Sequence, residues 1–177
     1  MIATCTASSD VGSDGSSFAR TSAIRLTPVQ RCWPHRCFSI LDDVLGPDGH
    51  GPSSSHTIAP QRIAAEAFTL LGGVPETATV YLFNSFATTG HGHRTDVAIT
   101  AGLLGFKPTD ARTRTAQECA LEAGLRIEWL PIQDTSEHPN TLFFRLTRGP
   151  VSVGLKAISI GGGNYDVVQR ERLVRAA

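Results

Sequence analysis

The order in which helical and strand-like patterns follow one another limits the folds open to this chain more than any other feature. Apolar residues recur at helical spacing in four segments: 38–45, 55–71, 95–104 and 115–123. Residues typical of strands fill four others, three of which cluster late: 77–83, 125–130, 141–146 and 151–160. Helices that come early and strands that cluster late favour an α+β layer over a strict βαβ winding.

The two ends of the chain differ in composition from the middle. Residues 1–36 are rich in Ser and Thr with scattered apolar residues, so we expect a disordered leader. An organelle transit peptide and an over-called start codon are alternatives for this segment. We expect one folded domain over 37–165. Residues 166–177 are charged and are interpreted as a short helical tail.

Charge and cysteine content exclude several classes of function. The 177 residues include 16 basic and 16 acidic side chains, with no basic stripe, so we expect no nucleic-acid partner. No apolar run approaches the length that a bilayer requires, so we expect no membrane partner. The four cysteines do not form a CxxC pair, which favours reduced thiols in a cytoplasmic protein.

Three serines and a histidine stand directly before the helix expected over 55–71. Ser53, Ser54 and Ser55 can cap the free N–H groups of the first helical turn, which also bind anions such as a carboxylate. His56, followed by Thr57, adds a group that exchanges a proton near neutral pH. A capped helix with an incidental histidine is the alternative. One cap residue would satisfy the helix, so the run of serines favours a functional site.

A second polar segment lies where a strand gives way to a helix, at residues 84–96. It combines glycines, which let the backbone approach a ligand, with two histidines, an arginine and Asp96. A polar loop in which Asp96 caps the helix is the alternative. Two further segments carry weaker signals, because each could be a plain turn: Ser159–Gly163 and His138–Thr141.

These segments, in this order, resemble the β-chain domain of iron–sulfur-dependent L-serine dehydratases (L-serine ammonia-lyases). The shared motifs are GPSSSHT at 51–57, a GH-x-TD pattern ending the loop 84–96, GLLG at 102–105, HPNT at 138–141 and SIGGG at 159–163. The resemblance covers roughly residues 37–165. It departs from the family pattern at Asn84 and Ala59, where the family commonly has glycine.

The resemblance implies that L-serine is converted to pyruvate and ammonia with a four-iron, four-sulfur cluster and no pyridoxal phosphate. One cluster iron acts as a Lewis acid on the serine hydroxyl. This chain has no family-like cysteine set, so a separate α subunit is expected to carry the cluster. The implied fold is a mostly antiparallel sheet of the allosteric substrate-binding domain type.

Roles for individual residues follow from the same resemblance and from what the reaction needs. His56 is the expected base, and His93 is expected to assist proton transfer to the leaving hydroxyl. The expected substrate-binding residues, including those that order the loop, are Ser53, Ser54, Ser55, Thr57, Ser85, Thr88, Gly92 and Asp96. Asp96 is expected to orient a histidine or to cap its helix.

Two other functions are compatible with the same residues. His91, His93 and Asp96 have a spacing that could hold zinc in a metal-dependent hydrolase, although no distal ligand set accompanies them. A non-catalytic allosteric amino-acid-binding module is the other alternative, since a shared fold does not settle function.

Overall fold

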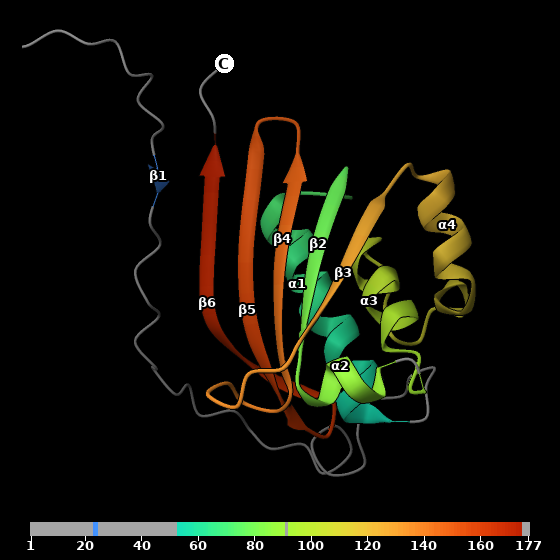
Figure 1. Ribbon diagram of the computed structural model, residues 1–177. Helices are drawn as coiled ribbons and strands as arrows, with labels where there is room; N and C mark the ends of the chain where they lie inside the picture. Colours follow the sequence, from blue (N-terminus) through green and yellow to red (C-terminus); the bar gives the residue numbers. More distant parts are fainter. Residues whose placement is uncertain (1–22, 25–52, 91, 175–177) are drawn as a thin grey trace, which may run out of the picture.

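The computed structural model describes residues 23–24, 53–90 and 92–174 (Figure 1). Five long strands and a two-residue strand form one sheet, in the order β1-β6-β5-β4-β2-β3. The strands are β1 (Ala23–Ile24), β2 (Thr77–Phe83), β3 (Arg126–Ile132), β4 (Thr141–Arg148), β5 (Val151–Gly161) and β6 (Asn164–Val174). Neighbours pair antiparallel except β2 and β3, which are parallel. The domain is therefore α+β with a mostly antiparallel sheet, as the sequence predicts.

The helical elements come between residues 54 and 122. They are η2 (Ser54–Ile58), α1 (Ala59–Leu71), α2 (Ser85–Thr89), α3 (Thr95–Leu103), η3 (Ala111–Thr115) and α4 (Ala116–Glu122). Figure 1 shows α1 and α3 on one face of the sheet, with α4 beyond the β3 edge. In the described part of the chain, no helix is long and apolar enough to cross a membrane.

The core lies between the sheet and α1, because alternate residues of each strand point to that side. Leu142, Phe144 and Leu146 of β4 are fully buried. They pack with apolar residues of α1 and the neighbouring strands, among them Ile63, Ala67, Val80, Val153 and Leu155. On the opposite face, Tyr81 and its register partner Phe143 lie with ring centroids 5.2 Å apart and are only partly buried.

The helices α1 and α3 pack closely because Gly102 has no side chain. A Cβ there would lie 2.2 Å from the Gln61 carbonyl oxygen and 2.7 Å from the Ala64 Cβ. Gln61 is itself buried, and its amide donates to the Phe106 carbonyl oxygen and to the Thr113 hydroxyl. This glycine contact and these hydrogen bonds fix the start of α1 against α3 and the turn that follows it.

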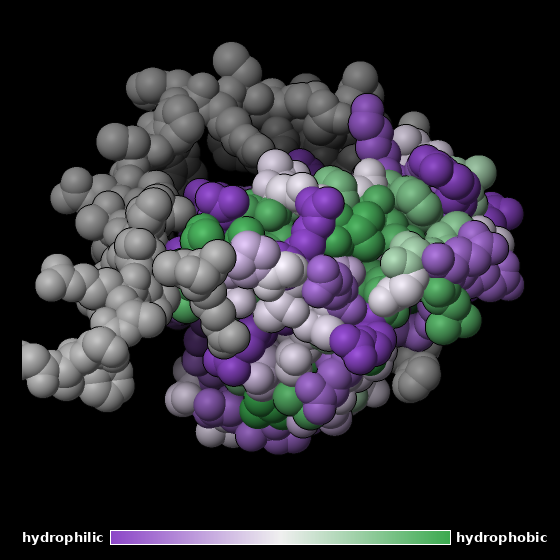
Figure 2. Space-filling model, turned by 90° about the horizontal axis from the view of Figure 1, so that it is seen from above, coloured by the Kyte–Doolittle hydropathy of each residue, from purple (hydrophilic) through white to green (hydrophobic). Residues whose placement is uncertain are grey.

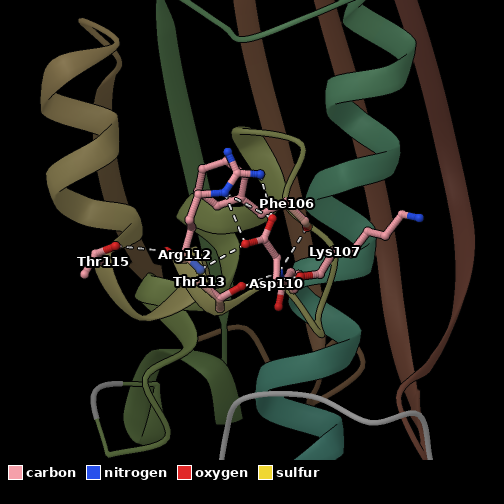
Figure 3. Close-up of polar contacts among 7 residues, drawn as sticks. Phe106, Lys107, Asp110, Arg112, Thr113 and Thr115 are labelled. Carbon is pink, nitrogen blue, oxygen red and sulfur yellow. Dashed lines mark hydrogen bonds and ion pairs between the residues drawn. The ribbon is translucent and has the colours of Figure 1, made fainter.

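That turn, residues 106–115, forms a compact polar corner (Figure 3). The Arg112 guanidinium donates to both Asp110 carboxylate oxygens and lies 4.3 Å from the centre of the Phe106 ring. Asp110 also caps η3, since its side chain accepts from the Arg112 N–H at 2.9 Å. The corner carries the chain from α3 to α4 through paired polar groups.

The C-terminal segment differs from the expected short helical tail. Residues 164–174 form β6, so the sheet extends past residue 165. Glu66 of α1 accepts from Tyr165 Oη at 2.7 Å and pairs with Arg170. Burial, then the Glu66 contact, raises the pKa of Tyr165 to about 12. The charged residues that suggested a tail therefore lie in a strand, which contacts α1 through Glu66.

Other expectations meet the structure in different ways. The strand expected over 77–83 is confirmed, and the polar loop 84–94 contains the short helix α2. The helix expected over 38–45 and most of the leader lie outside the described residues, apart from Ala23–Ile24, which pair with β6.

Candidate active site

The chemistry-bearing segments meet at one end of the sheet, the lower end in Figure 1. There β2, β3 and β5 end, β4 and β6 begin, and η2, α2 and α3 start. Figure 2 views the opposite end of the molecule, where hydrophilic and hydrophobic residues alternate in small patches. The predicted motifs, separated by up to a hundred residues in sequence, are thereby brought together.

The serine turn, residues 53–57, opens a π-helical turn that runs into α1. Ser53 precedes η2 in an extended conformation, and its hydroxyl oxygen accepts from the His56 N–H at 3.3 Å. This confirms the capping expected of one serine. The hydroxyls of Ser54 and Ser55 are partly buried and bond to no other residue within the described ranges. A single π-turn inside a helix is frequent at functional sites.

His56 lies at the centre of the converging segments. Its Nε2 is 3.0 Å from Ser85 Oγ, and its ring centroid is 5.0 Å from those of Phe86 and His93. Partial burial, and secondarily the nearby His93, lowers the pKa of His56 below 6.5. Both effects disfavour the charged imidazolium. The neutral, proton-accepting form of His56 is therefore favoured over the charged form.

His93 lies beside His56 in a defined tautomer. Its Nδ1 is 3.0 Å from the Thr89 carbonyl oxygen, which can only accept, so Nδ1 carries the hydrogen. Its backbone N–H bonds the same carbonyl, and its own carbonyl oxygen accepts from Thr57 Oγ1 at 3.2 Å. Thr57, which is 2% exposed, thus connects the serine turn to the His93 segment.

Asn84 turns the chain from β2 into α2 in a backbone conformation that favours glycine. Its φ is 46° and its ψ is −102°. Its side-chain amide donates to the carbonyl oxygens of Asp134 and Glu137 and accepts from the Asp134 N–H. The asparagine that departs from the family pattern therefore anchors the loop between β3 and β4.

The remaining residues of this segment have varied surroundings. The Thr88 side chain is exposed, and its hydroxyl donates to the backbone carbonyls of Asn84 and Ser85. Gly92 is exposed, and a Cβ there would meet the Thr89 carbonyl oxygen at an ordinary contact distance of 3.6 Å. His91 lies outside the described residues. Thr88 orders α2 rather than pointing toward His56.

Asp96 does not cap its helix, and its carboxylate bonds to no histidine among the described residues. Arg94 occupies the position before α3, with a φ of 55°, so Asp96 is the second residue of the helix and not its cap. Its carboxylate accepts from Gln117 Nε2 of α4 at 2.9 Å, on the side of the helix that packs against α4. The carboxylate is bonded to α4 because α3 and α4 pack side by side, so it does not orient a histidine.

Known proteins support the interpretation of this end of the sheet. The sequence model of the family described as "Serine dehydratase beta chain" matches residues 47–125. A relative from Bacillus subtilis (strain 168), described as "Probable L-serine dehydratase, beta chain", is 41% identical over 127 residues, 72% of this chain and 58% of the relative. The "L-serine dehydratase, beta chain" of Peptoniphilus asaccharolyticus is 36% identical over 71% of this chain and 58% of its own length. Residues 47–125 carry the serine dehydratase beta-chain domain.

The beta-chain match includes the serine turn and the loop 84–96, and the chain spans about 58% of the length of these two relatives. The "L-serine dehydratase 1" of Escherichia coli (strain K12) is 43% identical over 67 residues, which are 34% of this chain and 14% of that protein. The resemblance thus rests mainly on the part of the chain that carries the two principal motifs.

A ligand set for a metal or cluster is missing from the described residues of this chain. No three His, Cys, Asp or Glu side chains there are grouped to hold a metal ion. Cys119, on α4, is a free, partly buried thiol, and Asp96 is bonded to Gln117 instead of lying with His93. The described part of the chain therefore does not fit a four-iron, four-sulfur cluster.

The structure also brings in residues that the sequence analysis did not assign to the site. Thr95 Oγ1 donates to the His56 carbonyl at 2.6 Å, and Ser159 Oγ donates to the Ser55 carbonyl at 3.0 Å. The Ser85 N–H donates to the Pro139 carbonyl at 3.0 Å, so the 138–141 turn joins the site. Ser159 and the turn lie in motifs with a weak sequence signal. Thr95 is the threonine of the GH-x-TD pattern, but the sequence analysis gave it no role in the site.

Proposed function

We propose that this chain is the β subunit of an L-serine ammonia-lyase, which eliminates ammonia from L-serine to give pyruvate. The observation that carries the proposal is His56. It is a partly buried imidazole whose pKa is lowered by burial, bonded to Ser85 and preceded by the serine turn, in a segment that matches the serine dehydratase beta chain.

The first requirement of the reaction is a base for the weakly acidic α-proton. In our proposal the Nε2–H of His56 donates to Ser85 Oγ, 3.0 Å away, which leaves the lone pair of Nδ1 to accept the proton. Within the described ranges, Nδ1 bonds to no other residue. The lowered pKa keeps the ring in its proton-accepting form at neutral pH.

The second requirement is to hold the substrate carboxylate while negative charge builds next to it. The first N–H groups of a helix have no partner within the helix and favour anions. We assign this role to the backbone of Ser54 and Ser55 and to their hydroxyls, which bond to nothing else in the described part of the chain. Ser53 and Thr57 shape the turn through the bonds described above.

The third requirement is a proton for the departing hydroxyl. His93 holds its Nδ1–H against the Thr89 carbonyl, so in our proposal Nε2 delivers the proton when the ring carries a hydrogen on both nitrogens, and the ring is left with the Nδ1–H alone. The ring centroid lies 5.0 Å from that of His56, close enough for both to serve one small substrate. The aminoacrylate that results tautomerises and hydrolyses to pyruvate and ammonia without further help.

The proposal assigns the four-iron, four-sulfur cluster to a separate α subunit. The described residues offer no ligand set for it, and two relatives of this chain are described as beta chains. We propose that the assembled enzyme works in the cytoplasm without pyridoxal phosphate.

Anaerobic co-expression with an α subunit tests the division of labour. The purified complex should be brown and should form pyruvate from L-serine, whereas this chain alone should be colourless and inactive. Turnover by the single chain, or a complex that holds a cluster but never forms pyruvate, would refute the proposal. Binding of L-serine without turnover in that complex would favour the allosteric amino-acid-binding module.

A further inference from the structure

Three hydroxyl groups hold the backbone on either side of His56. Ser53 Oγ accepts from the His56 N–H at 3.3 Å, and Thr95 Oγ1 donates to the His56 carbonyl at 2.6 Å. Ser159 Oγ donates to the preceding carbonyl, that of Ser55, at 3.0 Å. Both peptide groups that flank the His56 Cα are therefore tied to elements distant in the sequence, α3 and β5.

Pro60 explains why these carbonyls accept from side chains. In a π-helical turn the Ser55 carbonyl would pair with the N–H of residue 60, and in an α-helix the His56 carbonyl would pair with the same group. Residue 60 is proline, which has no N–H. The next available donor, Ala59 N–H, bonds to the Ser54 carbonyl instead.

The two donating hydroxyls lie in places where packing alone would favour an apolar residue. Thr95 and Ser159 are each 1% exposed. Ser159 continues the buried, helix-facing row of β5 formed by Val153, Leu155 and Ala157. A buried hydroxyl is costly unless it forms a hydrogen bond, so its presence in this row needs a partner such as the Ser55 carbonyl.

We propose that Thr95 and Ser159 are positioning residues for His56, an inference that rests on the function proposed above. Ser159 acts by a second route as well, because its N–H donates to the Asn140 carbonyl at 2.9 Å. Asn140 follows Pro139, whose carbonyl holds the Ser85 N–H, and Ser85 Oγ bonds the His56 ring. The end of β5 thus locates both the backbone and the ring of His56.

The physical reason is the precision that proton transfer demands. Fixing both flanking peptide groups fixes the φ and ψ of His56 and hence the direction of its Cα–Cβ bond. A misplacement of about 1 Å can lower a rate by roughly a hundredfold. A turn in which proline has removed the helical donor for both of these carbonyls needs these external bonds to hold that direction.

The first test needs no activity and uses the full-length chain. Long-range proton–nitrogen NMR correlations would report the His56 ring, assigned with a His56→Gln variant. Thr95→Val and Ser159→Ala should each shift or broaden the His56 ring signals. Thr100→Val is the matched control, because Thr100 is also buried on α3 but donates to the Asp96 carbonyl of its own helix. It should leave the His56 signals unchanged.

The second test measures pyruvate formation by complexes with equal cluster content. Thr95→Val and Ser159→Ala should lower kcat by about tenfold to a hundredfold while KM changes much less. Thr95→Ser keeps the hydroxyl and should restore both kcat and the ring signals, which also guards against a Thr95→Val variant that fails to fold.

The outcomes of the two tests separate the proposals. Unchanged His56 signals in folded Thr95→Val and Ser159→Ala would overturn the positioning role whatever the activity. Altered signals in a complex that never turns over serine would leave the positioning intact and refute the proposed function. Altered signals with wild-type kcat would also overturn the inference, because the position of His56 would then not matter to the reaction.

Discussion

The active-site end and the polar corner at residues 106–115 use polar side chains in opposite ways. In the corner, Arg112 pairs with Asp110 (Figure 3). From α1, the Gln61 amide donates to the Phe106 carbonyl and to the Thr113 hydroxyl of the corner. These hydrogen bonds and this ion pair join α1 to the segment that connects α3 with α4.

At the candidate active-site end, hydroxyls bond to backbone groups, and one nitrogen of each imidazole is left without a hydrogen bond in the described ranges. Ser53, Thr95 and Ser159 hold the backbone around His56, while His56 Nδ1 and His93 Nε2 bond to no other residue in the described ranges. The comparison teaches that a polar cluster is a candidate for chemistry when its bonds fix the reactive groups without saturating them.

The largest expected effect comes from removing the central imidazole. His56→Ala should lower pyruvate formation by about a hundredfold or more, the usual scale for a lost general base. His56→Gln keeps a polar side chain but cannot cycle a proton, so it should be equally poor. The measurement is steady-state pyruvate formation by reconstituted complexes with equal cluster content.

Substrate affinity and subunit assembly should change much less than pyruvate formation, since Ser53 still caps the turn. If His56→Ala retained near wild-type turnover, the unengaged imidazole would be a structural feature only. The contrast between the two regions would then lose its functional meaning.

Removing the Gln61 amide, which bonds to the corner from α1, should lower stability without affecting the chemistry. Gln61→Leu preserves size but leaves the Phe106 carbonyl without its buried donor, which should cost about 1–3 kcal/mol of unfolding free energy. Urea unfolding of the full chain measures this loss. The kcat of the assembled complex should be unchanged, and a large fall in kcat with full stability would show that the corner reaches the active site.

Sequence patterns predicted the elements whose period is clear. The strand Thr77–Phe83 has the predicted bounds because its side chains alternate across a sheet with one buried face. β6 was missed because its charged residues resemble a solvated tail, whereas its pairing with β5 and the Glu66 contacts are long-range. Local charge is thus a poor guide to a strand whose charged side chains contact a helix far away in the sequence.

The site was predictable in its motifs but not in its connections. The serine turn, His56, Ser85 and His93 come together as the motifs suggested. The roles of Thr95 and Ser159 depend on carbonyls that Pro60 leaves without donors, and only the three-dimensional structure shows which hydroxyls reach them. Asp96 illustrates the converse, because its motif position suggested a histidine partner and packing gave it Gln117.

Removing one of the two imidazoles should lower turnover, because His93 is the proposed proton donor, and should also shift the pH profile of the activity that remains. His93 contributes to lowering the pKa of His56, so His93→Asn should raise that pKa, although burial, the larger cause, persists. His56 must be neutral to act as a base. The acidic limb of the kcat/KM profile should therefore move to higher pH. An acidic limb that does not move would mean that the two rings do not interact.

The smallest expected effect is at the surface of the corner. The Arg112 side chain is 65% exposed, so its ion pair with Asp110 is screened by solvent and exposed pairs of this kind contribute little to stability. Arg112→Ala should therefore leave the melting temperature and kcat within experimental error of the wild-type values. Differential scanning calorimetry and pyruvate formation measure the two, with Gln61→Leu as the buried counterpart. A loss of stability as large as that of Gln61→Leu would show that the ion pair stacked on Phe106 holds the corner. The buried Gln61 amide alone would then no longer account for the stability of this region.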